Sequence, residues 1–426
     1  YAPSAFSTYS GRVSQFLVQS VLLAGPSDNA EETEEAEEWV SRDALGEAGV
    51  SRVYAVKILA NWLLGLERHL LTREIVQLVL GTLRQLVRNG GAMQAGAGSA
   101  HEQQHLLLTA AGCMLKLAGL AHFEKMLNTA DVLSLGLVVQ NPCFEVRSAF
   151  LLGKLLPALV AQRIHVRYIP AVFLVAYEPE AAVRENVRHA VEQRLALMRP
   201  TPGSPSVVED CICRLLYVLA SHPDWDDAQP VATLELFAPY IEFYISCVCL
   251  AQNVSLLFCY AGELKAYRSK GASDVATHRL YILSELAQYL LREKSMAANW
   301  PLNVYPGRLT LPAGLFEPLP DTEKAAMPRK PFLDPEFITR RAKAPAASKR
   351  SRAKPAFASA SKNGGSTKRP QKPANAAATA ASKRKGKGKA PANIHSDEDD
   401  NDDEGMDEDE EDIEMSSVAE TSDEDN

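Results

Sequence analysis

The sequence is poor in aromatic residues, and its last part carries charge of only one sign over long stretches. Phe, Trp and Tyr make up 7% of the 426 residues. Between positions 341 and 395 there is no Asp or Glu against 15 Lys and Arg, whereas positions 397–426 hold 18 Asp and Glu and no Lys or Arg. Segments with so little apolar surface and so much like charge cannot bury a core. This excludes a globular domain after position 340.

Fingerprints of common enzyme classes are missing as well. The sequence holds no G-x-S-x-G nucleophile elbow, no Walker-type phosphate loop and no G-x-G-x-x-G dinucleotide motif. Alternation of polar and apolar residues, which would indicate strands, persists nowhere. We therefore predict no catalytic residue, no resident metal and no cofactor.

Helical periodicity fills the first 296 residues. Apolar residues recur with helical spacing at 56, 59, 60, 63 and 64, and again at 283, 286, 287, 290 and 291. Breakers at 25–26, 89–91, 200–203 and 222–223 separate such segments. The pattern predicts an all-α fold.

Two of these helices open with the same motif, 37 residues apart. Each has a proline, expected in the first helical turn, followed four residues later by Val-Arg: Pro142 with Val146-Arg147, and Pro179 with Val183-Arg184. Asn141 is expected to be the N-cap of the first helix. A period near 40 residues is typical of HEAT-type hairpins, which stack into a solenoid. We predict a HEAT-type α-solenoid over residues 1–296, with the four Val and Arg side chains as stacking residues.

The segment 297–340 is rich in proline and lacks helical periodicity. It also carries Trp300, Tyr305 and Phe316, which would be exposed if the segment lay free in solvent. We expect this extended segment to pack on the last repeats.

The sharpest catalytic candidate is the H-E-x-x-H pattern at 101–105. It places His101 and His105 on one helical face for zinc, with Glu102 as general base and Glu124 as a third ligand of a zinc hydrolase. The helix predicted over 106–120 would carry the chain about 21 Å past His105 at ~1.5 Å per residue. The few residues that follow cannot bring Glu124 back. We therefore expect a solvated helix start rather than a metal site.

Two cysteine pairs, Cys211-x-Cys213 and Cys247-x-Cys249, have the look of metal ligands. Positions two apart point to nearly opposite sides of a helix, so we predict buried structural thiols instead. The apolar stretch 243–262 has polar residues at its middle, which predicts two buried helices meeting near Asn253 and no membrane partner. The glutamate run at 31–38 predicts a solvated helix face or loop, with a surface that repels DNA or a site for a basic partner as the alternative.

Compact basic clusters distinguish residues 341–395, which we predict to be a disordered basic tail. They comprise Lys349, Arg350, Arg352, Lys383, Arg384, Lys385, Lys387 and Lys389. Mobile cations of this kind serve nuclear targeting or weak, non-specific contact with DNA phosphates. Phe357 is the only aromatic residue there, which argues against base stacking. The alternative is a merely solubilising tail.

Residues 396–426 are predicted to form a disordered acidic tail. Ser396 and Ser422 have acidic residues directly downstream, which is typical of sites for acidophilic kinases. The acidic block is suited either to binding basic proteins or to screening the basic block from DNA.

Several segments of the helical part have a family-specific character. They are Leu135–Arg147, Tyr240–Tyr244, Gln252–Leu257, Leu280–Gln288, Trp300–Gly307 and Leu311–Phe316, with further likeness at Trp39–Val40 and Ala55–Asn61. These segments resemble the C-terminal HEAT region of the Precocious Dissociation of Sisters family, in its fungal branch. The resemblance covers about residues 35–340; the tail matches only in composition.

The resemblance implies a nuclear, chromosome-associated scaffold without enzymatic activity. It implies binding to cohesin through the kleisin subunit, together with the cohesin release factor and the cohesin acetyltransferase, and a role in maintaining and releasing sister chromatid cohesion. A generic HEAT adaptor in nuclear transport or phosphatase assembly is the alternative, although it leaves the likeness at Leu280–Gln288 and Trp300–Gly307 unexplained.

Overall fold

The computed structural model describes residues 9–23, 39–65, 72–94, 98–202, 204–271, 273–307, 309–312, 314–327 and 330–343. All of them belong to the first of two compact units, which ends at Phe357. The glutamate run at 31–38 and the predicted tails beyond Lys343 lie outside the described residues.

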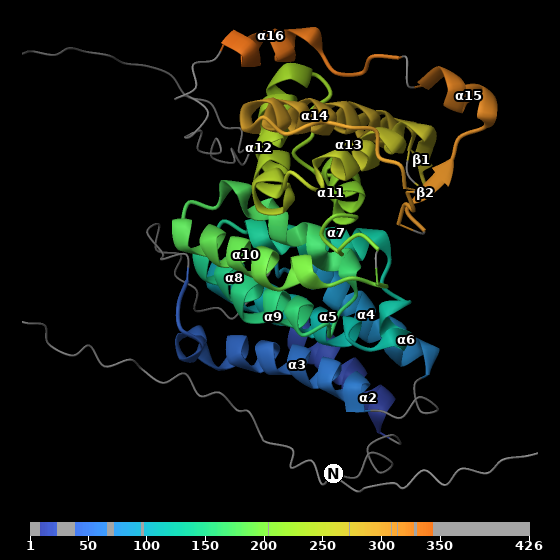
Figure 1. The fold of residues 1–426 in the computed structure, drawn as a ribbon. Coiled ribbons are helices and arrows are strands. Elements are labelled where there is room, and N and C mark those ends of the chain that lie inside the picture. The colour runs from blue at the N-terminus through green and yellow to red at the C-terminus, as the bar shows by residue number, and fades with distance from the viewer. Residues whose placement is uncertain are drawn as a thin grey trace, which may run out of the picture. The chain divides into compact units, whose positions relative to one another are not determined.

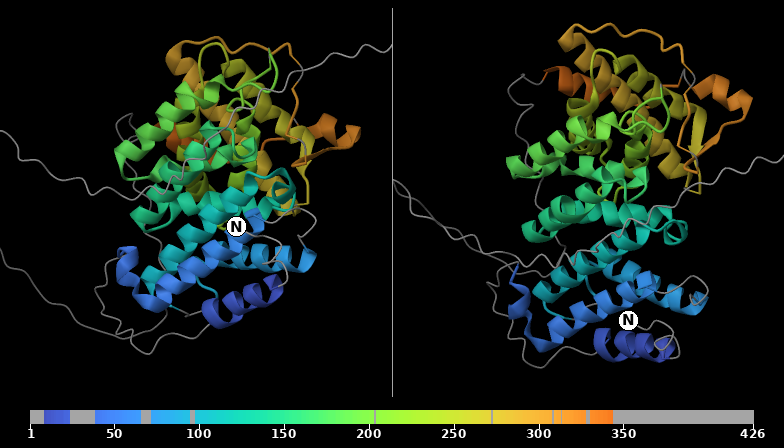
Figure 2. Two further views of the ribbon diagram at one scale, coloured as in Figure 1. Left: turned by 90° about the horizontal axis from the view of Figure 1, so that it is seen from below. Right: turned by 60° about the horizontal axis from the view of Figure 1, so that its bottom comes forward.

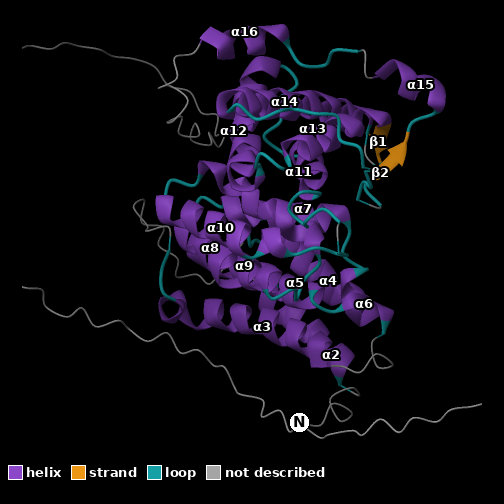
Figure 3. Cartoon of the chain, viewed as in Figure 1, coloured by secondary structure: helices purple, strands orange, loops and turns teal. Residues whose placement is uncertain are grey.

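Helices make up most of the described chain, and strands are few and short (Figures 1 and 3). The α-helices are α2 Ser10–Phe16, α3 Gly46–Gly65, α4 Arg73–Arg88, α5 Ala100–Ala118, α6 Ala121–Glu124, α7 Thr129–Leu137, α8 Phe144–Phe150, α9 Leu156–Val160, α10 Ala181–Gln193, α11 Cys211–Ala220, α12 Pro230–Val248, α13 Val254–Glu263, α14 Asp274–Ala298, α15 Asp321–Ala326 and α16 Pro335–Lys343. The segments η1 Leu17–Leu22 and η5 Leu151–Leu155 are π-helical, and η2 Arg42–Leu45, η4 Val138–Gln140, η6 Val166–Tyr177, η7 Leu195–Leu197 and η8 Leu264–Ala266 are 3₁₀ helices.

The helices pair along the sequence, and successive pairs stack on one another (Figure 2). α3 packs against η1 and α5, α4 packs against α5, and α5 packs in turn against α8. Further along, η6 contacts α7, α11 and α12, while α14 covers α11, α12 and α13. Because each pair buries its apolar face only against its neighbours, the core runs from Val18 in η1 to Phe337 in α16. This arrangement confirms the predicted all-α solenoid.

Side-chain caps and one glycine turn explain where several helices begin and end. The side chains of Thr72, Ser99 and Ser273 accept backbone N–H bonds at the starts of α4, α5 and α14. α4 ends at a turn where Gly91 has φ 98° and donates to the Leu86 carbonyl. A Cβ at Gly91 would lie 1.8 Å from a backbone oxygen of α5, so only glycine fits there.

The helices that carry the Val-Arg motif start slightly later than the sequence suggested. Cys143 and Glu180 are the N-caps of α8 and α10, so both prolines precede the N-cap instead of lying in the first turn. Asn141 is not the N-cap; its Oδ1 accepts the backbone N–H of Cys143 at 2.8 Å. The expectation of Asn141 as N-cap was therefore wrong by two residues, because the short amide side chain folds into a local turn before the helix.

Between α8 and α9 the helix widens into the π-helical segment η5 without breaking. Pro157, in the first turn of α9, has no N–H to donate to the carbonyl of Gly153, and its ring would crowd that carbonyl. A local widening of the ladder relieves both effects.

The segment after α14 is only partly extended: the prediction of an extended 297–340 was wrong for α15 and α16, which are too short to leave a helical period in the sequence, and the segment also includes a strand that the sequence did not predict. β2 Phe316–Pro318 pairs antiparallel with β1 Tyr267–Ser269, with Arg268 opposite Glu317. Three-residue strands are too short to show a period of two in the sequence. Trp300, Tyr305 and Phe316 all pack against the core of the repeats.

The last described helix shifts the boundary between the folded part and the basic tail. Arg341, which the sequence placed first in the tail, lies in α16, where its guanidinium pairs with Glu293 at 2.8 Å and with Glu242. Two carboxylates from α14 and α12 thus keep this cation in the folded unit, which composition alone could not indicate.

One described helix, α12, is long and apolar enough to cross a membrane, and 67% of it is buried within the fold. α12 ends at Val248 and α13 begins at Val254, with Asn253 as its N-cap. The prediction of two buried helices meeting near Asn253 is confirmed.

Candidate partner-binding site

Arg147 connects two successive layers of the solenoid. It lies in α8, and its guanidinium reaches back to the carbonyls of Asn141 at 3.3 Å and Pro142 at 2.6 Å. Its Nε is 2.6 Å from Oε2 of Glu178, whose side chain is 3% exposed and lies just before α10. Val146 beside it is fully buried.

Arg184 repeats this arrangement one motif later. Its guanidinium donates to the carbonyls of Glu178 and, at 3.1 Å, of Pro179, which occupy the places of Asn141 and Pro142. Val183 is also buried. The sequence repeat is therefore a structural repeat, in which each arginine closes the turn before its own helix.

Other buried ion pairs join neighbouring layers in a similar way. Arg52 of α3 pairs with Glu102 of α5 at 2.6 Å, with both side chains at most 10% exposed. The fully buried carboxylate of Asp131 in α7 binds both Arg84 and Arg88 of α4, at 2.9 and 2.8 Å. These buried carboxylates, Glu102 and Asp131, are thus neutralised by arginines from a neighbouring layer.

These contacts correct the expectation for the H-E-x-x-H pattern. Glu102 and His105 are buried, not solvated, with 8% and 7% exposure. His105 stacks on Trp39 with ring centroids 3.9 Å apart, and its Nε2 is 2.8 Å from the Val40 carbonyl. Burial lowers the pKa of His105. The imidazole and the carboxylate are engaged in packing, because the chain before α3 folds onto the start of α5.

Glu124 lies at the end of α6, where it pairs with Arg167 at 2.7 Å instead of approaching His105. No group of three His, Cys, Asp or Glu suited to a metal occurs among the described residues. All seven cysteines are free thiols, and all but Cys259 are buried. Burial raises the pKa of Cys247 and Cys249 to about 11, as expected for structural thiols.

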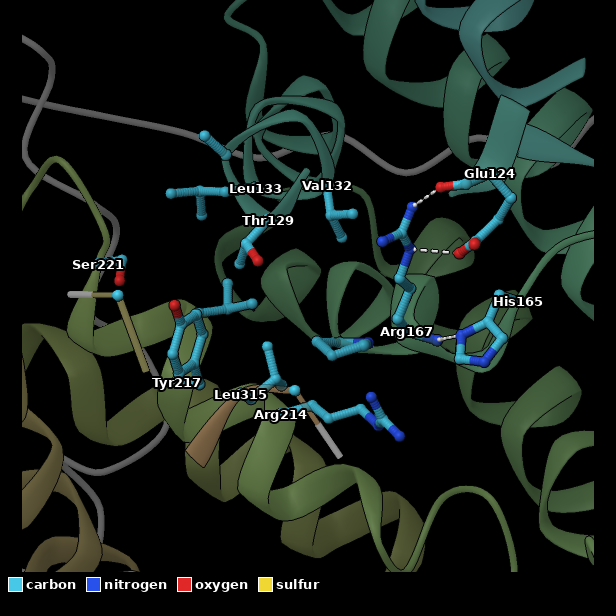
Figure 4. A pocket seen from close by; sticks show the side chains of 15 residues that line it. Glu124, Thr129, Val132, Leu133, His165, Arg167, Arg214, Tyr217, Ser221 and Leu315 are labelled. Carbon is cyan, nitrogen blue, oxygen red and sulfur yellow. Dashed lines mark hydrogen bonds and ion pairs between the residues drawn. The ribbon is translucent and has the colours of Figure 1, made fainter. Parts of the chain in front are cut away.

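A pocket of about 500 Å³ opens between α7, η6, α11 and the residues just before β2 (Figure 4). Val132 and Leu133 of α7, with Pro170 of η6, supply apolar surface. Tyr217 and Arg214 project from α11. The Nε atom of Arg214 is buried and has no hydrogen-bond partner. Such a cavity has room for one side chain of a partner.

Glu124 and His165, an acid and a base that line this pocket, both contact Arg167. Its guanidinium pairs with Glu124, and its backbone N–H donates to Nδ1 of His165 at 3.2 Å. Burial lowers the pKa of His165, which keeps the ring neutral at pH 7. Thr129 and Ser221 lie on the opposite side from this base (Figure 4). The arrangement is suited to binding rather than to activating a nucleophile.

The sequence patterns did not indicate this pocket. The signal available was Arg214 itself, a lone cation inside the apolar run of α11. The tail residues predicted for nuclear targeting, DNA contact and phosphorylation lie outside the described part of the chain.

Comparison with known proteins agrees with the helical architecture. The family model described as "Sister chromatid cohesion protein PDS5 protein" matches residues 1–317. The chain is 26% identical to Sister chromatid cohesion protein pds5 of Schizosaccharomyces pombe over 76% of its length, covering 27% of that protein. It is 24% identical to the PDS5 protein of Saccharomyces cerevisiae over 79% of its length, covering 29% of it. Human homolog A is 23% identical over 70% of the chain. The chain spans about a quarter of the length of these relatives.

Proposed function

Because the chain belongs to the PDS5 family of sister chromatid cohesion proteins, we propose that it is a non-enzymatic scaffold that regulates cohesin on chromosomes. In this role it holds cohesin through the kleisin subunit and works with the cohesin release factor and acetyltransferase. The family resemblance supports these partners and a nuclear, chromosome-associated location. Since the chain spans about a quarter of its relatives, it supplies one part of that scaffold.

The main support for the scaffold role is that the buried charged side chains join layers of helices to one another. Arg52, Asp131 and Arg147 each join one layer of helices to another. Glu102 and His105, the residues with the best claim to catalysis, are engaged in the same kind of packing. A rigid stack of helical layers offers a long surface for extended partners.

The tail has a separate role in this proposal. The clusters around Lys349–Arg352 and Lys383–Lys389 provide nuclear targeting and weak, sequence-independent contact with DNA. Phosphorylation at Ser396 and Ser422 adds negative charge to the acidic block, which strengthens its attraction to basic proteins or to the basic tail.

The test is a pull-down of cohesin subunits by the full chain from nuclease-treated nuclear extract. Nuclease removes retention through DNA bound to the tail, and a variant with Gln at the eight clustered Lys and Arg provides the matched control. We expect both proteins to retain the kleisin subunit. Loss of the kleisin subunit from both would contradict the proposal, and enrichment of transport or phosphatase subunits would favour the generic adaptor.

A further inference from the structure

Three lysines on successive layers stand apart from the neutralised charges described above. Lys57 belongs to α3, Lys116 to α5 and Lys154 to η5, and α5 contacts the other two elements. Lys116 and Lys154 are exposed and Lys57 is half-buried. None of the three forms an ion pair with a carboxylate in the described part of the chain, where Arg52, Arg84, Arg147 and Arg167 all do.

The three ammonium groups share one face and act on one another. The side chain of Lys154 lies across α5 at Gly112, where a Cβ would come within 2.9 Å of its Cδ and 3.4 Å of its Nζ. Partial burial lowers the pKa of Lys57, and the positive charges of Arg42, Lys154 and Lys116 lower it further. Although the residue as a whole is exposed, the end of the Lys154 side chain packs against α5, and this local burial, followed by the charge of Lys116, lowers its pKa. The face therefore carries uncompensated positive charge.

Exposed apolar side chains border this charge. Tyr54 and Ile58, one turn apart on α3, are 49% and 48% exposed. The ammonium of Lys57 lies 5.7 Å from the centre of the Tyr54 ring. Tyr54 thus links the lysines to the exposed apolar side of α3, and these residues are called the lysine face (Tyr54, Lys57, Ile58, Lys116 and Lys154).

We propose that the lysine face binds an extended, acidic segment of a partner protein that also carries apolar side chains. Packed helices lie ~8–10 Å apart, which equals about three residues of extended chain. In the polyproline II form of an extended chain three residues make one turn and span ~9 Å, so carboxylates at every third residue share one side of the segment and would face the three lysines. The apolar residues between them would cover Tyr54 and Ile58, for which the sugar-phosphate backbone of DNA has no matching surface. This inference deepens the proposed scaffold function and rests on it.

The test uses the full chain and a fluorescein-labelled 15-residue peptide with Asp at every third position and Leu or Gly between. The triple variant Lys57→Gln, Lys116→Gln, Lys154→Gln should bind this peptide about tenfold more weakly at low salt, since each exposed ion pair contributes modestly. The control variant Lys125→Gln, Lys270→Gln, Lys343→Gln removes three exposed lysines elsewhere and should stay within about twofold of the parent.

Two further binding measurements distinguish the contribution of the charged side chains from that of the apolar ones. A peptide with Asn in place of Asp should lose affinity for the parent chain but not for the triple lysine variant. The variant Tyr54→Ser, Ile58→Ser should weaken binding while leaving its salt dependence unchanged, because the cations remain. Thermal unfolding of each variant monitors the fold.

Several results would overturn the proposal. They are equal binding of the Asp and Asn peptides, equal losses in the lysine and control variants, and absence of binding at low salt. If the triple variant lost affinity for a 30-base-pair DNA duplex but not for the peptide, the face would be a nucleic-acid surface instead. Failure of the cohesin pull-down with peptide binding intact would contradict the proposed function alone.

Discussion

Replacing Arg147 by alanine tests whether buried ion pairs hold the layers of the solenoid together. The substitution removes the bond from Nε to Oε2 of Glu178 at 2.6 Å and a second from Nη2 to Oε1 at 3.3 Å. It also frees the carbonyls of Asn141 and Pro142. Glu178 then remains buried with the backbone N–H of Glu180 as a donor at 3.1 Å.

The magnitude follows from the burial of the carboxylate that is left behind. A buried charge that loses its partner costs about 3–5 kcal/mol. Since the side chain of Glu178 is 3% exposed but keeps one backbone donor, we expect a loss near the lower end, about 3 kcal/mol. Glu178→Gln keeps an acceptor and removes the charge, so it should cost less, about 1–2 kcal/mol.

Urea unfolding followed by circular dichroism measures these losses, and hydrogen exchange in α8 and α10 shows where they act. A cycle of Arg147→Ala, Glu178→Ala and the double variant isolates the coupling between the two side chains, expected to exceed about 1 kcal/mol. The exposed pair Arg340–Glu336, with side chains 55% and 59% exposed, is the matched control and should show about 0.5 kcal/mol or less. Coupling in the Arg147 cycle no larger than in this control would refute the reasoning.

Three other predictions address single groups and the tail. Because burial lowers the pKa of His105, the unfolded chain binds more protons below its ordinary pKa of about 6.5, so stability should fall as pH drops from 7 to 5. His105→Gln should flatten that part of the urea-midpoint profile, and an unchanged slope would contradict the assignment; metal analysis of the same protein should find no stoichiometric zinc. Cys211 and Cys213, both fully buried with raised pKa, should resist iodoacetamide in the native chain while Cys259 reacts, as mass spectrometry would show; equal labelling would be the opposite result. Deleting residues 344–395 should weaken DNA binding and reduce its salt dependence in fluorescence anisotropy, whereas unchanged binding at low salt would remove the tail from this role.

Most of the fold could be predicted from the local periodicity of apolar residues. The apolar spacing within α3 and α14, and the break near Asn253, were readable because helix formation and burial leave a period of 3.6 residues in the sequence. The Val-Arg motif also identified the repeat, since the turn that Arg147 closes lies within six residues of it. The strand pair β1–β2 was missed, because neither strand is long enough to leave a pattern.

The sequence by itself therefore determined the helical class, the repeat and the family, all of which depend on local spacing or on segment order. Only the tertiary structure decided which charges are paired. Arg52 pairs with Glu102, which lies 50 residues later in the sequence. This ion pair shows that the glutamate of the apparent zinc motif takes part in packing. The same stacking brought Lys57, Lys116 and Lys154 onto one face, where none of them pairs with a carboxylate of the described residues. Periodicity reports how deeply each residue is buried, but the partner it meets depends on how the layers stack.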